Sequence, residues 1–291
     1  MVMSYADLFA KTYEAFLQHE DKQTASLYAR NLLCKASGLR YEEILANRDL
    51  PVTQETRDAV ERAIVRLMTG VPLAYVLGEW DFYGMNLDVD ENVLIPRDDT
   101  CAVTSLAINQ ALFLDSEPRV LDLCTGSGCI GLAVANRVKD ARVTLADISR
   151  EALMVAKRNI KGQKLSARVS CVHVNALEPA PAFLGQFDMI ISNPPYITTE
   201  EMEQLDRSVK DFEPHLALHG GEDGLDFYRS IAVNFKSALK PGGYICFEFG
   251  MGQGNAVCQI LEENQYKILD RVNDYNNVER AVLAQLGRKE D

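Results

Sequence analysis

Residues 120–131 read VLDLCTGSGCIG, which is an apolar strand, a loop with glycines at 126, 128 and 131, and the start of an apolar helix. Glycines let the backbone turn sharply and bring a ligand against the helix N-terminus. The G-x-G-x-x-G spacing also occurs in dinucleotide sites, but Asp122 would repel a pyrophosphate and suits a ligand's ammonium group. Asp147, at the end of the next strand, is placed to accept hydrogen bonds from ribose hydroxyls. The pattern predicts a nucleoside ligand with a cationic end, the alternative for Asp122 being a turn cap.

Strand and helix patterns alternate along the chain around this loop. Strand patterns lie at 119–124, 141–147, 167–174 and 187–192, and amphipathic helical patterns at 129–138 and 150–160. Such alternation requires a mostly parallel sheet with helices on both faces, which is an α/β fold. In sheets of this kind the ligand binds at the carboxyl ends of the strands, where the strand order reverses.

The N-terminal part of the chain has a different pattern. Apolar residues recur every three to four positions through residues 1–70, which predicts a small helical bundle. Aromatic and branched residues between 75 and 95, with Gly84 near their middle, predict a β-hairpin. We therefore expect a helical domain at 1–70, a hairpin linker at 71–97 and the ligand-binding domain at 98–291.

Composition and charge argue against several classes of protein. The chain has 291 residues, of which 47% are hydrophobic and 25% charged, as in ordinary globular proteins. Its net charge of −12 disfavours direct nucleic-acid binding, which depends on clustered Lys and Arg. The sequence has no apolar run that could span a bilayer and no signal-peptide pattern, so we expect no membrane association and a cytoplasmic location. Seven scattered cysteines without a C-x-x-C pair predict neither disulfides nor a metal site.

The stretch FDMIISNPPYI at 187–197 carries the chemistry. Asn193, Pro194, Pro195 and Tyr196 follow an apolar strand and are expected at the same sheet edge as the glycine loop. Prolines lack an N–H, so the carbonyls of this loop remain available as acceptors. The Asn193 side-chain oxygen and the Pro194 carbonyl are able to receive both hydrogens of a planar NH2 group, and Tyr196 offers a flat face for stacking.

An amide nitrogen needs such acceptors because its lone pair is delocalised into the carbonyl. Two acceptors aimed at its hydrogens place the nitrogen in line with a sulfonium methyl group and stabilise the positive charge that develops. Asn193, Pro194 and Tyr196 are therefore the candidate catalytic residues of a methyl transfer to an NH2 group. The alternative is that the segment is only a proline-rich turn after a buried strand.

With both motifs in view, the chain resembles the PrmC/HemK family of peptide chain release factor glutamine N5-methyltransferases over nearly its full length. Shared stretches are GVPLAYVLGEWDFYG at 70–84, VLIPRDDT at 93–100 and EPHLALHGGEDGLDFYRSI at 213–231. The resemblance implies a seven-stranded class I methyltransferase domain that uses S-adenosyl-L-methionine and releases S-adenosyl-L-homocysteine. It implies class I release factors as the protein substrate, methylated at the glutamine of their Gly-Gly-Gln motif. The chain is expected to be monomeric.

The resemblance also assigns individual residues. Implied cofactor-binding residues are Asp122, Thr125, Gly126, Gly128, Asp147, Ile148, Asn175, Ala176 and Asn193. Implied substrate-binding residues are Phe82, Gly84, Arg97, Asn193, Pro194, Pro195 and Tyr196. Departures from the family pattern are Cys124 in the glycine loop, Asn175 in place of an acidic residue, Asp98 in place of proline and Cys101 in place of glutamate. Glu248, at a strand end, is expected to support a loop.

Two other functions stay open at this stage. An amino-methyltransferase acting on adenine or cytosine of DNA or RNA shares the N-P-P-Y chemistry, but it needs a basic face or a recognition domain, which the sequence does not show. A catalytically silent binding protein would keep the fold and lack cofactor affinity, and a cofactor titration separates it from both enzymes. Residues 1–70 carry no chemistry of their own and are expected to recognise the protein substrate.

Overall fold

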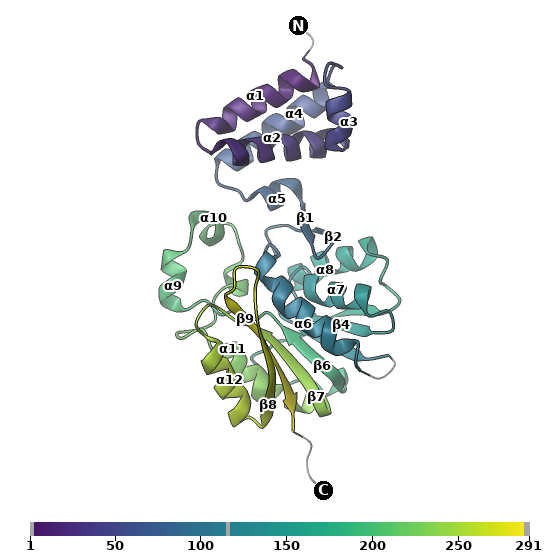
Figure 1. The fold of residues 1–291 in the computed structure, drawn as a ribbon, viewed down its shortest axis with the longest axis vertical. Coiled ribbons are helices and arrows are strands. Elements are labelled where there is room, and N and C mark those ends of the chain that lie inside the picture. The colour runs from purple at the N-terminus through teal and green to yellow at the C-terminus, as the bar shows by residue number, and fades with distance from the viewer. Residues whose placement is uncertain (1–2, 115–116, 288–291) are drawn as a thin grey trace. The chain divides into compact units, whose positions relative to one another are not determined.

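The computed structural model describes residues 3–114 and 117–287 (Figure 1). The chain divides into two compact units, Met1–Gly78 and Glu79–Asp291. The segment 71–97, expected to be a linker, is shared between them, because residues 71–78 belong to the first unit and 79–97 to the second. Each unit has its own buried apolar core.

The first unit is helical, as its apolar spacing predicts. Its helices are α1 (Tyr5–Leu17), α2 (Lys22–Ser37), α3 (Tyr41–Ala46), α4 (Gln54–Met68) and α5 (Leu73–Leu77). Side-chain oxygens of Asp21 and Thr53 cap α2 and α4 by accepting backbone N–H groups of the first helical turn. One buried apolar cluster of the unit contains Leu8, Leu33, Ile44, Val52 and Val60.

The hairpin is shorter than the sequence pattern predicts. Strands β1 (Glu79–Phe82) and β2 (Met85–Asp88) form it, whereas residues 73–77 are helix α5 instead of strand. Pro72 stands at the N-cap of α5 and lacks the N–H that strand pairing requires, so this apolar stretch becomes one helical turn. Tyr83 and Gly84 connect the strands with φ of 51° and 78°, the conformation of a type I′ turn.

The second unit is built on one large sheet, here called the main sheet. Within the described residues it has seven strands in the order β5-β4-β3-β6-β7-β9-β8. They are β3 (Arg119–Leu123), β4 (Arg142–Asp147), β5 (Val169–His173), β6 (Phe187–Ser192), β7 (Leu239–Glu248), β8 (Tyr266–Asn273) and β9 (Glu279–Leu286). β9 runs antiparallel to β7 and β8, and the other pairs are parallel. From β3 the chain builds β4 and β5 on one side and then returns to add β6 on the other, so the order reverses between β3 and β6.

Helices cover both faces of the main sheet (Figure 1). The covering helices are α6 (Cys101–Ala111), α7 (Cys129–Arg137), α8 (Arg150–Gly162), α11 (Asp226–Asn234) and α12 (Gly254–Glu263). The unit also contains helices α9 (Thr199–Gln204) and α10 (Arg207–Lys210), which bury no residue, and the short 3-10 helices η1 (Asp98–Thr100), η2 (Ala182–Leu184), η3 (His215–Ala217) and η4 (Lys236–Ala238). Val120 of β3 shares one core with α6, α7 and α8, whereas its neighbour Leu121 shares the other with α11 and α12. Alternate strand residues are therefore buried on opposite faces, which confirms the predicted α/β fold. Among the described helices, none is both long enough and apolar enough to cross a bilayer.

The hairpin turn gives the first testable prediction. At Gly84 an added Cβ would meet no atom within 4 Å, so Gly84→Ala changes only the backbone preference at a positive φ. We expect a loss of about 1 kcal/mol in the free energy of unfolding, measured in urea. Gly162→Ala is the matched control, because its Cβ also enters open space and Gly162 lies in helix α8 without a positive φ. Equal stabilities of the two variants would contradict the turn assignment.

Candidate functional site

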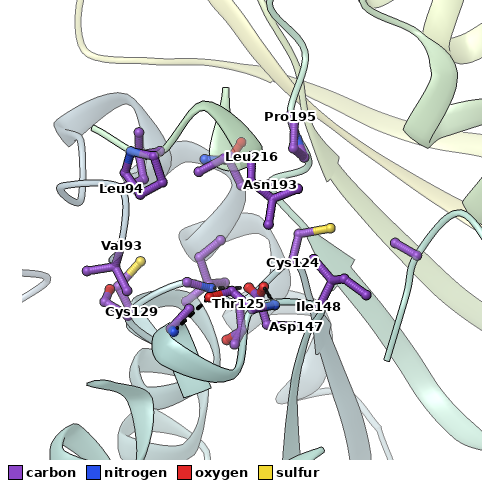
Figure 2. Close-up of a pocket in the computed structure, with 18 of the residues that line it drawn as sticks. Val93, Leu94, Cys124, Thr125, Cys129, Asp147, Ile148, Asn193, Pro195 and Leu216 are labelled. Atoms are coloured by element: carbon purple, nitrogen blue, oxygen red, sulfur yellow. Dashed lines mark hydrogen bonds between the residues drawn. The ribbon is translucent and has the colours of Figure 1, made fainter. Parts of the chain in front are cut away.

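A cavity of ≈ 260 Å³ lies where the strand order of the main sheet reverses. Its walls come from the loops that follow β3, β4, β5 and β6 and from segments 92–100 and 214–217. Figure 2 shows Thr125, Asp147, Ile148 and Asn193 around it. Residues singled out from the sequence that line it are Arg97, Thr125, Gly126, Asp147, Ile148, Asn175, Ala176, Asn193 and Pro195. The glycine loop and the N-P-P-Y segment thus share one cavity.

Asp147 holds the glycine loop against the end of the neighbouring strand. Its Oδ2 accepts the Gly126 N–H at 2.9 Å and its Oδ1 accepts the Ser149 N–H at 2.9 Å. Burial raises the pKa of Asp147, and the hydrogen bonds from these two backbone groups oppose the rise. Because Asp147 also lines the cavity, it presents acceptor oxygens to a ligand from a fixed position.

Asp122 lies beneath the glycine loop and does not reach the cavity wall. It is fully buried, and its Oδ2 accepts hydrogen bonds from Thr125 Oγ1 at 2.6 Å and from the Gly131 N–H at 2.9 Å. Burial raises its pKa to about 7, against the pull of these two hydrogen bonds. In this structure Asp122 holds the turn of the loop, which was its alternative role, and its contact with a ligand's ammonium group stays a prediction. Gly128 also lies off the cavity wall, at the N-cap of α7.

Ile197, which directly follows the N-P-P-Y segment, pairs with residues 218–220. The Ile197 N–H donates to the Leu218 carbonyl at 2.9 Å, and the Gly220 N–H donates to the Ile197 carbonyl at 2.8 Å. A Cβ on Gly220 would lie 2.6 Å from Tyr196 Cα, and one on Gly224 would lie 2.3 Å from the Tyr196 carbonyl oxygen. Both positions need glycine because the backbone after β6 passes directly against them.

Two members of the tetrapeptide, Pro194 and Tyr196, are not among the residues that line the cavity. Pro194 is buried, and Tyr196 packs against the core that α11 and α12 share with the sheet. The Tyr196 carbonyl accepts a hydrogen bond from Gln253 Nε2 at 3.0 Å, and burial raises the pKa of its phenol well above its usual value. Stacking of Tyr196 on a substrate stays a prediction.

Of the substrate-binding residues expected in and after the hairpin, only Arg97 lines the cavity, whereas Phe82 and Gly84 do not. Arg97 lines the cavity and forms an ion pair with the buried Glu213, whose other oxygen accepts the Ile95 N–H. Phe82, by contrast, is only 3% exposed in the core under α6 and α7, and Gly84 forms the hairpin turn. These two residues shape the hairpin and do not line the cavity.

The departures from the family pattern have distinct structural settings. Cys124 has a φ of +60°, a left-handed conformation that glycine adopts without strain, so the loop keeps its turn with a less suitable residue. Asn175 lines the cavity and its Nδ2 donates to Glu178 Oε1 at 3.0 Å. Asp98 begins η1 and Cys101 begins α6, and neither lines the cavity.

Comparison with known proteins identifies the family. A model of the PrmC N-terminal domain matches residues 10–78, and a model of the methyltransferase small domain matches residues 102–221. A release factor glutamine methyltransferase of Chlorobaculum tepidum is 38% identical over 278 residues, which cover 94% of each chain. The chain belongs to the release factor glutamine methyltransferase family. The enzyme of that name from Clostridium acetobutylicum is also 38% identical, over 84% of this chain and 85% of its own.

Solved structures support the fold of this family. A methyltransferase from Pyrococcus furiosus superposes with a TM-score of 0.51 at 17% identity, over 78% of this chain and 99% of its own.

In the described part of this chain, no three His, Cys, Asp or Glu side chains gather as a metal site would require.

Sequence reasoning missed several residues that build the site. Thr100, Glu213, Leu216 and Phe227 fall within the stretches shared with the family, but their individual roles were not assigned. Glu213 is 4% exposed, and a charged residue in a loop gives no sequence signal of such burial. Its partner Arg97 lies more than a hundred positions away, so only the fold reveals the pair.

A second prediction concerns the buried Glu248, which is 1% exposed at the end of β7. Burial raises its pKa to about 8, and the negative charge of Asp99 adds to this rise. Side-chain hydrogen bonds from Thr100 and Asn193 and the positive charge of Arg280 act in the opposite direction and lower the pKa. The unfolded chain has a glutamate pKa of about 4.3, so the folded protein holds an extra proton between these values. Stability from the neutral carboxyl is complete below the unfolded pKa and is lost as pH rises through the folded one.

Glu248→Gln removes this titration and is therefore expected to gain stability relative to the wild type as pH rises. The difference in unfolding free energy should grow by up to about 1.4 kcal/mol per pH unit between about pH 5 and about pH 8. Urea unfolding of both proteins across this pH range measures the difference. Asp122 titrates in both proteins, so its contribution to the pH dependence is removed when the two free energies are subtracted. A difference that does not change with pH would show that Glu248 is not protonated in the folded protein.

Proposed function

We propose that this chain transfers a methyl group from S-adenosyl-L-methionine to the side-chain amide nitrogen N5 of glutamine in the Gly-Gly-Gln motif of class I release factors, thereby modulating translation termination. The observation that carries the proposal is the single cavity in which the glycine loop and Asn193 share a wall. Two relatives that are 38% identical to this chain are named release factor glutamine methyltransferases.

The cavity walls fit the proposed cofactor. Asp147 presents carboxylate oxygens suited to ribose hydroxyls, and Ile148 and Ala176 supply apolar surface for an adenine ring. At Gly126 an added Cβ would meet nothing within 4 Å, so the loop leaves open space for the amino-acid end. When bound, the cofactor supplies an electrophilic methyl group on a sulfonium.

Asn193 and Pro194 are the residues that would position the substrate amide. The Asn193 side chain lines the cavity, and in the described part of the chain no backbone N–H donates to the Pro194 carbonyl. Two acceptors can then take the two N–H groups of the glutamine side chain, which fixes the plane of the amide. They also stabilise the positive charge that grows on nitrogen as it attacks.

A protein substrate suits the electrostatics better than nucleic acid does. The net charge of −12 would repel a phosphate backbone. We assign recognition of the release factor to the helical unit, which matches the PrmC N-terminal domain, and propose that the enzyme acts as a monomer in the cytoplasm, where release factors work. An amino-methyltransferase acting on DNA or RNA is the competing function, and it predicts methylated nucleic acid instead.

Removing the Asp147 carboxylate tests the cofactor site. Asp147→Ala is expected to weaken S-adenosyl-L-methionine binding by ~1.5 to 3 kcal/mol, the scale of charge-assisted hydrogen bonds. Calorimetric titration measures it, with Glu151→Ala as the control because that exposed acid on α8 does not line the cavity. Unchanged affinity in a folded Asp147→Ala protein would remove Asp147 from the site.

Tandem mass spectrometry of a purified release factor, after incubation with enzyme and cofactor, tests the activity. The expected product carries one methyl on the glutamine of Gly-Gly-Gln, and Asn193→Ala should lower single-turnover rates by ~10² to 10³. Cofactor affinity of that variant should change by less than about tenfold. Methylation elsewhere, or wild-type rates in Asn193→Ala, would defeat the proposal.

Asn193→Asp refines this test, because Asn193 Nδ2 donates to Thr100 Oγ1 at 3.3 Å. An aspartate keeps an acceptor but cannot donate this hydrogen bond, and it places a second carboxyl beside Glu248. We therefore expect Asp to lose about as much activity as Ala.

A further inference from the structure

The side chains of Thr100, Asn193 and Glu248 come from separate parts of the sequence and meet at the start of the N-P-P-Y segment. Ser192 of β6 pairs with Phe247 of β7, so Asn193 and Glu248 are the next residues on adjacent parallel strands. Thr100 lies at the end of η1, where the chain enters α6. Their meeting depends on the fold, since Thr100 and Glu248 lie far apart in the chain.

The contacts among these residues are directional. Asn193 Nδ2 donates to Thr100 Oγ1 at 3.3 Å, and side-chain hydrogen bonds from Thr100 and Asn193 act on the Glu248 carboxyl. Thr100 is 2% exposed and Glu248 is 1% exposed, so water does not compete for these groups. Asn193 and Thr100 both belong to this cluster and line the cavity, whereas Glu248 does not line it.

Charge pairing leaves Glu248 without a dedicated cation. Arg280 is the nearby positive residue, but its guanidinium binds Asp99 at 2.8 Å and Asp274 at 3.0 Å. In the described part of the chain Glu248 has no salt bridge, and its Oε2 has no hydrogen-bond partner. The Glu248 carboxyl therefore interacts with Thr100 and Asn193 through hydrogen bonds and forms no ion pair.

We propose that Thr100 and Glu248 are positioning residues, which hold the Asn193 carboxamide with Nδ2 turned into the protein and Oδ1 turned toward the cavity. This inference rests on the proposed function of Asn193 as an acceptor for the substrate amide. A carboxamide that rotates by half a turn would present its own NH2 to the substrate NH2, and two donors cannot bond to each other. The acceptors Thr100 Oγ1 and Glu248 favour the productive rotamer.

The neutral form of Glu248 suits this arrangement. Its pKa of about 8 keeps the carboxyl protonated at neutral pH, with one oxygen left as an acceptor. A neutral carboxyl orients Asn193 without placing a full negative charge behind the substrate amide.

Thr100→Val is the main test, because valine keeps the shape of threonine and removes the hydroxyl. We expect kcat for release factor methylation to fall about tenfold, the effect of one lost buried hydrogen bond, with KM and cofactor affinity within about twofold. Thr100→Ser should restore kcat to within about threefold. The matched control is Thr104→Val one turn along α6, where a fully buried threonine hydroxyl donates only to the Thr100 carbonyl, and its kcat should equal that of the wild type.

A double variant shows whether Thr100 acts through Asn193. In an Asn193→Ala background, Thr100→Val should cause no further loss of kcat, because the side chain that it positions is gone. A full tenfold loss in that background, or a wild-type kcat in the single Thr100→Val variant, would overturn the inference.

Hydrogen exchange of the Asn193 side-chain NH2 decides the same question without substrate. The signal is assigned by its disappearance in Asn193→Ala, and Thr100→Val should speed its exchange about tenfold while Thr104→Val leaves it unchanged. If the wild-type enzyme proves inactive on release factors, the proposed function fails, but this measurement still tests the positioning. Unchanged exchange in Thr100→Val would show that the hydroxyl does not hold the carboxamide.

Discussion

Strands β3 and β6 pair in parallel at the centre of the main sheet, with Leu123 opposite Ser192, and the rest of the site depends on this pairing. The two strands end level with each other, so the glycine loop and the N-P-P-Y segment leave the sheet side by side. Ser192 Oγ reinforces the junction by donating to the Leu123 carbonyl at 2.6 Å. A shift of register by one residue would turn Ser192 and its neighbours to the opposite faces and separate the cofactor loop from Asn193.

Buried carboxyl groups hold each loop that leaves this junction. Asp122 lies under the glycine loop, Glu213 binds the segment around Arg97, and Glu248 lies behind Asn193. Each of the three is less than 5% exposed, so each needs hydrogen bonds or a charged partner to offset the loss of water. The ligand-facing surface is thus rigid because polar groups beneath it have few alternative partners. In the proposed mechanism, acceptors held in this way surround the substrate amide, and no ionised base is used.

The sequence predicted the α/β fold because the strands are nearly continuous apolar runs and each is followed by a helical pattern. It located the cavity through Asp147 and Asn193, since residues at the ends of parallel strands gather at one edge. It did not predict α5, where Pro72 overrides the strand preference of an apolar stretch. Nor did it show that Asp122 points beneath the loop, because a strand-end acid has the same pattern whether it faces a ligand or the protein.

The contacts that sequence reasoning could not supply are those between distant segments. The pairs Arg97–Glu213 and Asn193–Thr100 join residues about a hundred positions apart, and no local pattern records such a contact. Gly220 and Gly224 were recognised only as part of a shared stretch, although their close approach to Tyr196 is what requires glycine. Most residues of the site lie in loops and turns, and tertiary structure determines which distant residues they contact.

In the proposed mechanism two acceptors, one of them Asn193 Oδ1, receive both hydrogens of the substrate amide. A glutamine that already carries one methyl has a single N–H left, and its methyl group would collide with one acceptor. The most direct measurement is the mass of the Gly-Gly-Gln peptide after exhaustive incubation of release factor with excess enzyme and cofactor. We expect the glutamine to gain one methyl group and no second one, whereas accumulation of a dimethylated side chain would contradict the two-acceptor arrangement.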